Sequence, residues 1–538
     1  MNASSVWHTP GHADRYRERV YAARERLAAE HKDMSGTQAR VLADLLAFNA
    51  DTEFGRRHGF ARIRTMDDFR AAVPLQDYTA HAPLIERTAA GERGLLTADA
   101  PEAYFTSSGS TGAHKKVPVT PRFMSTTFMP FYFAAWAPLI EHFPEVLQRP
   151  DAVLNLKHDP LTAPPTTADG RPYAGASQVD FGARFGEPLS AEPGTGAPWA
   201  VLPVPTDPGD HLERAYLRLR LAVQSDLRCL IGINPAMIAA VPYQLNLWWP
   251  RIVKEVRDGT LGGLPHQAPD PRRADRLEQL AEYFGTVRPA HVWPRLRALF
   301  CWTTGVASLY LPALRAEFGN DVTVLPAPVA ASEGPTGVAL DRHASAGSLV
   351  ASAAVYEFVP ADHDLTPGSA TLLPHEIEAG RDYHVVFSHV GGFYRYTVGD
   401  VVRVVDRVGA VPRVEYAGRG CAPTRRGSDC GTPRSYGPCT PLWAPADSAC
   451  ATWRAGSSRT PTTPAGTSSR SRPAAPGTSG RPPASPPIWT APSPPSPPST
   501  ATPGAPAGWG GRRFGCWTAR RSPVTGTRQS TRESGRPR

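Results

Sequence analysis

The sequence predicts an α/β protein with a large body, a β-rich subdomain and a C-terminal tail that stays disordered. Strand and helix patterns alternate up to about residue 325, as in a body of helices packed on sheets. Residues 350–415 then give one strand pattern after another. After residue 420 the composition changes abruptly, because 22 of the 58 prolines lie in the last 118 residues and apolar side chains become rare. Such a segment buries too little apolar surface to offset the entropy lost on ordering.

Helical patterns open the chain. Apolar side chains recur at helical spacing in residues 14–50, which predicts helices there. Asp67 and Asp68 predict the N-terminal cap of a short helix that Pro74 ends, and Pro83 predicts the start of another.

Three longer helices are expected further along, at residues 211–230, 235–258 and 272–284. Pro242 and Pro250 predict that the second of these is divided into shorter pieces, because an internal proline removes a helical hydrogen bond.

Short apolar runs rich in β-branched and aromatic side chains predict the strands. The expected strands cover residues 103–106, 298–302, 322–325, 355–359, 383–388, 393–397 and 401–405.

Between the first two of these strands, we expect residues 128–143 to form a buried helix with a break and residues 158–200 to be irregular.

The overall basicity of the chain comes from its tail. The formal net charge is +9, but residues 421–538 contain 16 Arg, no Lys and three acidic residues. The first 420 residues therefore carry a net charge of −4. A mildly acidic body lacks the excess of basic side chains that binds the phosphates of nucleic acids, so no nucleic-acid partner is expected.

The lack of a recognisable targeting signal and the small number of cysteines before residue 420 predict a cytoplasmic protein. The N-terminus lacks the basic start and apolar run of a secretory signal, and no run of 18 apolar residues predicts a membrane span. Only Cys229 and Cys301 precede residue 420, which suits a reducing compartment. The oligomeric state cannot be predicted from these features.

A loop of small residues followed by two lysines predicts a nucleotide site. Glycines let the backbone approach a ligand, and hydroxyls and N–H groups can converge on phosphate oxygens. Lys115 or Lys116 then neutralises the charge of a triphosphate. The pattern G-x-x-x-x-G-K-[ST] of the kinase-type loop is absent, and a flexible Ser/Gly turn is the alternative interpretation. The small residues are Ser107, Ser108, Gly109, Ser110, Thr111 and Gly112.

A carboxylate after a predicted strand is the second candidate. Glu333 lies between Ser332 and Gly334, where its oxygens are suited to Mg²⁺. The alternative is a helix cap with a solvated Glu.

The third candidate is Asp400. It lies between the two strands predicted at residues 393–397 and 401–405, and a carboxylate there can accept hydrogen bonds from a ribose diol. A plain Gly-Asp hairpin turn at Gly399 and Asp400 is the alternative.

The three candidates occur in an order that resembles a known family. Residues 48–60 (FNADTEFGRRHGF) match the pattern n-x-x-T-x-[FY]-G-x-x-h-g-F of the Gretchen-Hagen-three (auxin-responsive promoter) family of acyl-acid–amido synthetases, in the adenylate-forming ligase superfamily. The loop at residues 107–116 and the later segments 231–235, 356–360 and 393–400 continue the similarity. It covers roughly residues 35–419.

The resemblance implies roles for the candidates and two cofactors, ATP and Mg²⁺. The hydroxyls of the small-residue loop bind β- and γ-phosphates, and Glu333 contributes to the Mg²⁺ and phosphate site. Residues 329–332, with Ser332, flank adenine, Asp400 binds the ribose, and Arg419 lies at the junction to a C-terminal domain. The family usually has an aromatic residue where this chain has Val329, which puts adenine stacking in question.

The resemblance also implies the reaction. A carboxylic acid attacks the α-phosphorus of ATP, and an amino acid then attacks the acyl-adenylate to give an amide. Two other hypotheses stay open: a non-catalytic nucleotide- or acid-binding remnant, and an acyl-CoA-type ligase. A serine hydrolase is disfavoured because G-x-S-x-G does not fit around Ser110.

The resemblance ends at residue 419, so the predicted domains are an adenylate-forming synthetase body at residues 1–419 and a low-complexity tail at 420–538. Family members continue with a small α/β domain that supplies a lysine, whereas this tail has none. We hypothesise a frameshift near codon 420, with impaired turnover as its consequence. A genuine disordered extension is the alternative, and an uninterrupted reading frame in independent sequencing of the locus would exclude the frameshift.

Overall fold

Two β-sheets of different kinds organise the protein. The computed structural model describes residues 10–108, 114–156, 164–176, 192–207 and 209–420. Within these ranges a four-stranded parallel sheet has the order β3-β5-β8-β9, and a seven-stranded antiparallel sheet has the order β10-β11-β12-β16-β15-β14-β13. The predicted α/β class is therefore confirmed, with the β-rich part at residues 329–419. The predicted tail lies outside the described residues, so its disorder and the domain boundary at residue 419 stay predictions.

The strands are short except near the C-terminal end of the described chain. They are β1 Ala103–Ser108, β2 His114–Val119, β3 Val153–Asn155, β4 Tyr173–Ala174, β5 Cys229–Ile231, β6 Thr260–Leu261, β7 Leu264–Pro265, β8 Ala298–Cys301, β9 Thr323–Pro326, β10 Val329–Ala331, β11 Gly334–Val338, β12 Gly347–Leu349, β13 Val355–Pro360, β14 Asp382–His389, β15 Phe393–Val408 and β16 Val411–Arg419.

Helices surround both sheets. They are α2 His12–Ala29, η1 Glu30–Lys32, α3 Met34–Asn49, α4 Glu53–Arg57, η2 Phe60–Arg62, α5 Met66–Ala72, α6 Tyr78–Ala89, α7 Pro121–Phe123, η3 Met124–Phe128, α8 Met129–Ala134, α9 Ala137–His142, η4 Pro144–Leu147, η5 Pro150–Ala152, α11 His211–Ala222, α12 Pro235–Asp258, α13 Pro271–Phe284, α14 Pro289–Val292, η8 Gly305–Tyr310 and α15 Leu311–Phe318.

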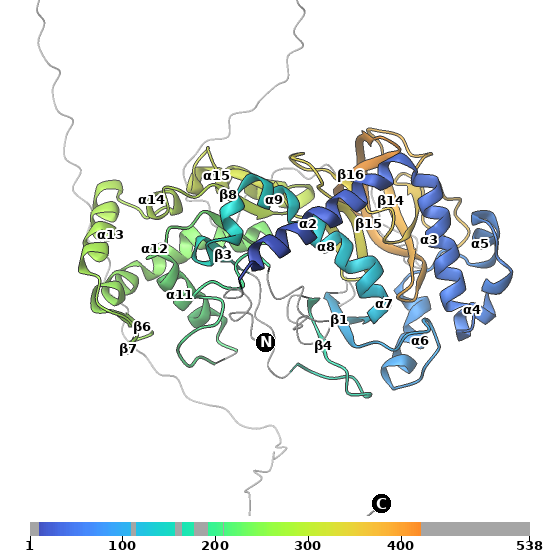
Figure 1. Ribbon diagram of the computed structural model, residues 1–538, viewed down its shortest axis with the longest axis horizontal. Helices are drawn as coiled ribbons and strands as arrows, with labels where there is room; N and C mark the ends of the chain where they lie inside the picture. The colour runs from blue at the N-terminus through green and yellow to red at the C-terminus, as the bar shows by residue number, and fades with distance from the viewer. Residues whose placement is uncertain (1–9, 109–113, 157–163, 177–191, 208, 421–538) are drawn as a thin grey trace, which may run out of the picture. The chain divides into compact units, whose positions relative to one another are not determined.

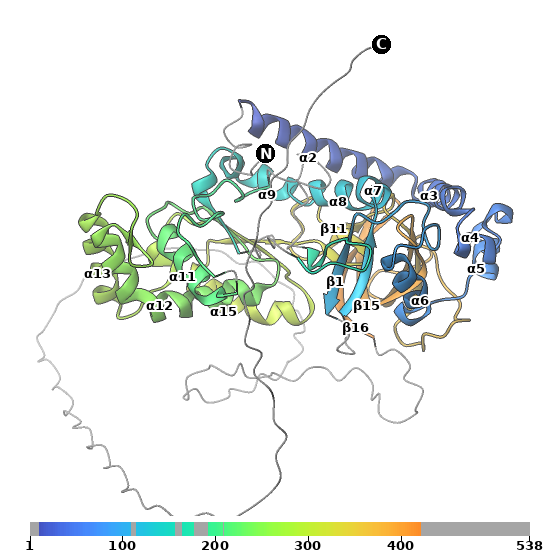
Figure 2. The same cartoon turned by 90° about the horizontal axis from the view of Figure 1, so that it is seen from below.

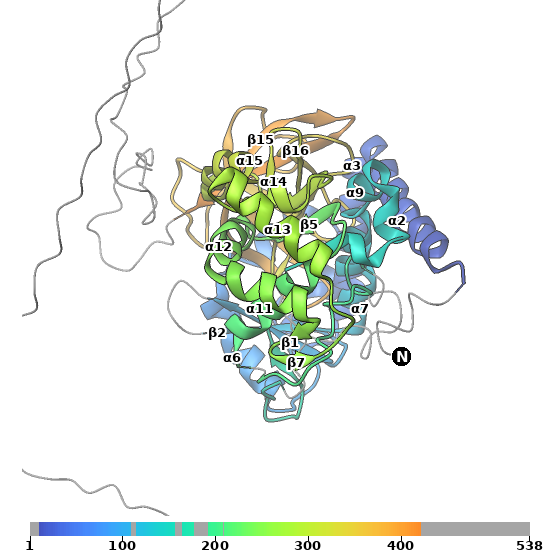
Figure 3. The same cartoon turned by 90° about the vertical axis from the view of Figure 1, so that its left-hand side faces the viewer.

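The parallel sheet is buried on both faces, as its continuous apolar runs require. Successive residues of β8 enter different cores, because side chains alternate along a strand. Ala298 and Phe300 pack into the core shared with α9, whereas Leu299 and Cys301 pack against α11 to α15. Figure 3 shows α11, α12 and α13 side by side over this part of the protein.

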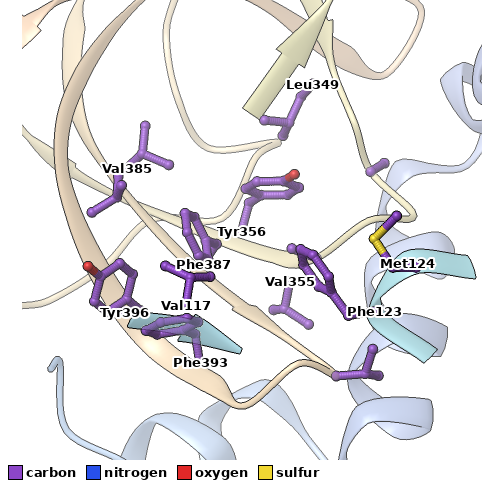
Figure 4. Packing of buried hydrophobic residues seen from close by; sticks show 14 of the residues in the cluster. Val117, Phe123, Met124, Leu349, Val355, Tyr356, Val385, Phe387, Phe393 and Tyr396 are labelled. Atoms are coloured by element: carbon purple, nitrogen blue, oxygen red, sulfur yellow. The ribbon is translucent and has the colours of Figure 1, made fainter. Parts of the chain in front are cut away.

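The antiparallel sheet packs against a small sheet with the order β2-β1-β4 and against the N-terminal helices. Figure 4 shows Val117 of β2 beside Phe393 and Tyr396 of β15, with Phe387 of β14 next to them. The Phe393 and Tyr396 ring centroids are 4.5 Å apart. This aromatic layer holds the β1–β2 hairpin against the large sheet.

Helix α2 is the longest element at the N-terminus and packs along α8 and α9. Figures 1 and 2 show it running across the row α7 to α9, with the antiparallel sheet near its α3 end. The prediction of a broken buried helix at residues 128–143 is confirmed, because α8 and α9 are separate buried segments.

Two predicted helix starts are wrong. Thr65, and not Asp67 or Asp68, caps α5. Its hydroxyl accepts a hydrogen bond from the Asp68 N–H, and the Asp68 carboxylate accepts one from the Thr65 N–H. Pro83 lies inside α6, which Asp77 caps, so it does not begin a helix. In both cases the capping residue precedes the predicted position.

The predicted division of the helix at residues 235–258 is also wrong. Helix α12 is continuous through Pro242 and Pro250. Its buried stripe, which includes Val241, Leu245 and Trp249, packs into the core of the parallel sheet, and this burial outweighs the hydrogen bonds that the prolines remove. The helix predicted at 211–230 ends at Ala222, and its last predicted residues enter β5.

Two further findings concern the cysteines and the helices. Cys229 and Cys301 are both buried free thiols. Among the helices in the described ranges, none combines the length and apolarity needed to cross a bilayer.

Candidate active site

The strands on either side of the predicted nucleotide loop pair with each other. Strands β1 and β2 pair antiparallel, with Ser107 opposite Lys115 and Thr106 opposite Lys116. In the described residues, strand β1 ends at Ser108 and strand β2 begins at His114. Ser107 and the backbone of Ser108 belong to β1, whereas Gly109, Ser110, Thr111 and Gly112 lie outside the described residues.

The hairpin separates the two lysines. Adjacent strand residues point to opposite faces, so Lys115 and Lys116 diverge. The Lys115 Nζ lies 3.2 Å from Glu333 Oε1 and 3.1 Å from the Tyr396 hydroxyl. The Lys116 Nζ instead lies 2.7 Å from both carboxylate oxygens of Glu86 on α6. Only Lys115 therefore joins the other predicted site residues.

Glu333 projects from a tight hairpin turn between β10 and β11, so the helix-cap interpretation is wrong. The residue is 3% exposed, and its Oε1 accepts a 2.9 Å hydrogen bond from the Tyr396 hydroxyl. A buried carboxylate needs such partners to offset lost hydration. Next to it, Ser332 Oγ donates to the Thr106 carbonyl at 3.3 Å, which ties the turn to strand β1.

His389 holds the Glu333 backbone from the other side. Its Nδ1 accepts from the Gly391 N–H at 3.1 Å, so Nε2 carries the proton and donates to the Glu333 carbonyl at 2.8 Å. Complete burial lowers the pKa of His389 to about 4, and the ring is therefore neutral at pH 7.

Two tyrosines complete the site, and neither was assigned a role from the sequence. Burial and the neighbouring Glu333 raise the pKa of Tyr396 well above its ordinary value, so its hydroxyl stays protonated. The Tyr78 hydroxyl accepts from the Lys116 N–H at 2.8 Å and donates to the Lys116 carbonyl at 3.2 Å. Burial raises the pKa of Tyr78 to about 12. Tyr396 belongs to a motif visible in the sequence, but nothing in the sequence shows which partner its hydroxyl meets.

Asp400 lies inside strand β15, so the interpretation of Gly399 and Asp400 as a hairpin turn is wrong. Gly399 has φ of +88°, and the pairing of β14 with β15 shifts register between His384 and Val386. An irregularity within one long strand takes the place of the predicted turn. Such an irregularity changes the direction in which the neighbouring side chains point.

The Asp400 carboxylate is 15% exposed and lies 3.3 Å from Arg419 Nε. Burial raises its pKa, while Arg419 opposes the rise; Glu333 raises it further and Lys115 lowers it. Asp400 therefore shares an electrostatic environment with Glu333 and Lys115. The structure brings Ser332, Glu333, Lys115, Asp400 and Arg419 to one region, with Lys116 on the opposite face of the hairpin.

The donor set fits Mg²⁺ held together with phosphates. No group of three metal-binding side chains exists in the described part of the chain. Mg²⁺ commonly takes one or two carboxylates and completes its shell with water and substrate phosphates. Both hydrogen bonds from described residues to the Glu333 carboxylate fall on Oε1, which leaves Oε2 for such a role.

Comparison with known proteins identifies the family. The profile of the GH3 family N-terminal domain matches residues 23–323, and that of the GH3 family central domain matches residues 347–419. The first match alone spans more than half of the chain. The chain belongs to the GH3 family. The predicted resemblance is thereby confirmed.

Plant proteins of the GH3 family are similar over long stretches. A probable indole-3-acetic acid-amido synthetase GH3.6 of Oryza sativa subsp. japonica is 34% identical over 183 residues, which are 32% of this chain and 36% of that protein. The probable GH3.12 synthetase of the same rice is 25% identical over 72% of this chain and 69% of its own length. Indole-3-acetic acid-amido synthetase GH3.6 of Arabidopsis thaliana is 23% identical over 70% of this chain and 66% of its own. The chain thus spans from about one third to just over two thirds of these relatives.

Solved GH3 structures share the fold. AtGH3.15 acyl acid amido synthetase in complex with 2,4-DB superposes with a TM-score of 0.60 at 20% identity, covering 74% of this chain and 70% of that one. A second GH3.15 structure gives 0.59 at 21% identity, covering 74% and 69%. At this identity the match bears on the fold alone, and the roles of the site residues stay predictions.

Proposed function

We propose that this GH3-family chain uses ATP to activate a carboxylic acid and conjugates it to an amino acid as an amide. The observation that carries the proposal is the cluster of Lys115, Glu333 and Tyr396 at the base of the predicted nucleotide loop, with Asp400 in the same electrostatic environment. The relatives' names as amido synthetases support the same reaction class.

In the proposed first step, a carboxylate oxygen of the acid forms a bond to the α-phosphorus of ATP. The bond from that phosphorus to the bridging oxygen breaks, and pyrophosphate leaves. Two anions must approach in line, so charge compensation and positioning carry most of the catalysis. Lys115 supplies a cation at the hairpin, held in place by Glu333 and Tyr396.

In the second step, the amino group attacks the carbonyl carbon of the acyl-adenylate, AMP leaves with the bonding electrons, and the new amide nitrogen loses a proton. No covalent intermediate with a protein nucleophile is required. Asp400 accepts hydrogen bonds from the ribose hydroxyls, and Ser107 with the loop residues contacts the phosphates. Mg²⁺, when bound through Glu333, supplies further neutralisation of the phosphate charge.

Acid-dependent exchange of labelled pyrophosphate into ATP, measured over a panel of carboxylic acids, tests the first step. We expect slow exchange with at least one acid, because residues 421–538 offer no lysine for the role that the family gives to its C-terminal domain. Mass spectrometry of the products with added amino acids then detects the amide.

The arms of this experiment separate the competing functions. A chain that binds Mg-ATP but exchanges with no acid is a nucleotide-binding remnant, and the ligase proposal is then wrong. Turnover with coenzyme A in place of amino acids indicates an acyl-CoA-type ligase. No affinity for Mg-ATP in the folded chain excludes all nucleotide functions.

A further inference from the structure

Arg395 stands out because its backbone is strained and its side chain is fully anchored. With φ of +43°, it is the sole non-glycine residue of the described ranges in the left-handed region. Side chains disfavour this conformation because Cβ approaches the backbone too closely. Such strain persists only when surrounding contacts determine it, and it gathers at functional sites.

The strain coincides with an irregularity in the pairing of β14 and β15. Phe387 pairs with Tyr396 and His389 pairs with Phe393, so Ser388 alone faces both Tyr394 and Arg395. The Arg395 N–H donates to Ser388 Oγ at 2.7 Å. A bulge of this kind changes the direction in which the following side chain points.

The guanidinium of Arg395 is buried among acceptors. Its Nε and Nη2 lie 2.9 and 3.0 Å from the two carboxylate oxygens of Glu357, a bidentate pair in which both side chains are at most 5% exposed. Its Nη1 donates to the carbonyls of Arg70 and Val73 at 3.2 and 2.7 Å. The side chain therefore fixes the backbone at residue 395 to strand β13 and to the C-terminal end of α5.

Backbone hydrogen bonds from Gln76, in the segment after α5, hold β15 on both sides of Tyr396. The Gln76 N–H donates to the Arg395 carbonyl at 3.0 Å, and the Thr397 N–H donates to the Gln76 carbonyl at 2.8 Å. Tyr396 lies between these two bonds, and its hydroxyl reaches Glu333 and Lys115. The position of that hydroxyl thus depends on the backbone angle one residue earlier.

We propose that Arg395 is a positioning residue that, through its ion pair with Glu357 and its left-handed backbone, aims the Tyr396 hydroxyl at Glu333 and Lys115. Buried ion pairs contribute little net stability compared with apolar replacements, so geometry is the better explanation for this pair. The proposal deepens the proposed function, because the residues that it positions belong to the same site.

Competitive acetylation of the full chain with acetic anhydride, followed by mass spectrometry, tests the proposal without any substrate. The chain has five lysines, and the side chains of Lys115 and Lys116 are almost equally exposed, at 22% and 23%. Lys116 therefore serves as the internal reference. In Arg395→Ala we expect Lys115 to label about tenfold faster relative to Lys116, since its charge-assisted hydrogen bonds are lost.

Two further variants sharpen the test. Arg395→Gly lacks the side chain but accepts a positive φ, so it retains part of the protection of Lys115. Arg403 lies on the same strand as Arg395 but outside the site, where it forms a bidentate pair with Asp382 of β14. Arg403→Ala removes this pair and leaves the labelling ratio unchanged. An unchanged ratio in folded Arg395→Ala overturns the proposal, and so does equal acceleration in the Ala and Gly variants.

Arg395→Ala leaves Glu357 buried without its main partner and is the variant at risk of not folding. The double variant Arg395→Met with Glu357→Leu removes both charges of this pair, while Arg70, which also contacts Glu357 at 3.1 Å, keeps its hydrogen bond to the Thr371 carbonyl. It must give the same accelerated labelling, and a wild-type ratio there overturns the proposal. The labelling needs no ATP, so its outcome tests the positioning role independently of the ligase activity. Protection of wild-type Lys115 by Mg-ATP tests the proposed function separately.

Discussion

The Tyr396 hydroxyl donates a 2.9 Å hydrogen bond to Glu333 Oε1, although 63 residues separate the two in the chain. Lys115 contacts both groups from a third part of the sequence. In a buried setting such a network is strong when every member is satisfied and costly when one is removed. The Lys115, Glu333 and Tyr396 cluster therefore gives sharp predictions.

Tyr396→Phe removes the hydroxyl and leaves a buried carboxylate oxygen with one partner fewer. We expect a loss of about 1–3 kcal/mol in the free energy of unfolding, measured with urea, and weaker Mg-ATP binding by calorimetry. Tyr394→Phe is the matched control, because the Tyr394 hydroxyl donates to the Leu96 carbonyl away from the site. The control should lose stability but keep its affinity; equal losses of affinity would contradict the assignment of Tyr396.

Lys115→Met and Lys116→Met should differ strongly. Loss of the Lys115 charge removes compensation where phosphate charge is expected, and we predict a fall in pyrophosphate exchange of about a hundredfold. Lys116 forms a pair with the exposed Glu86, so its replacement should change the rate by no more than about fivefold. A greater loss in Lys116→Met would show that the hairpin binds nucleotide through its other face.

The role of Asp400 can be read from its preference for ribose. Hydrogen bonds to a charged acceptor predict that the wild-type chain binds ATP about tenfold more tightly than 2′-deoxy-ATP. In Asp400→Ala this ratio should fall to about one, as competition binding would show. Asp382→Ala, which breaks a similar Asp–Arg pair with Arg403, should keep the preference. A preference that survives in Asp400→Ala would place the ribose elsewhere.

The buried carboxyl of Glu192 should make the stability of the protein depend on pH. The carboxyl is 5% exposed and accepts hydrogen bonds from Tyr132 and from Asn155, and burial raises its pKa from 4.5 to about 8. Above pH 4.5 the unfolded chain releases a proton that the folded chain keeps. This group therefore makes the protein less stable as the pH rises from about 4.5 to about 8.

Glu192→Gln removes the titration but keeps the shape. Its free energy of unfolding relative to wild type should increase across that window and level off above it, measured by denaturant unfolding at several pH values. Glu282→Gln changes an exposed carboxylate and is the control. Parallel pH curves for wild type and Glu192→Gln would contradict the assignment of a buried neutral carboxyl.

Local patterns predicted much of the fold. The helix predicted at residues 272–284 is α13, and the strand at 298–302 is β8, because apolar spacing within one element depends only on its own residues. Errors arose where distant contacts decide. Pro242 and Pro250 stay within α12 because its apolar stripe is buried against the parallel sheet, and Gly399 bends a strand that neighbouring strands extend on both sides.

By itself, the sequence determined the α/β class, the family and the set of candidate residues, since these follow from local periodicity and from the order of motifs. Only the tertiary structure decided that Lys115, and not Lys116, meets Glu333, and that Tyr396 and Arg395 belong to the same arrangement. The physical reason is that strand geometry sends neighbouring side chains to opposite faces. Which face meets the carboxylate depends on the packing of β2 against a sheet formed more than 200 residues later.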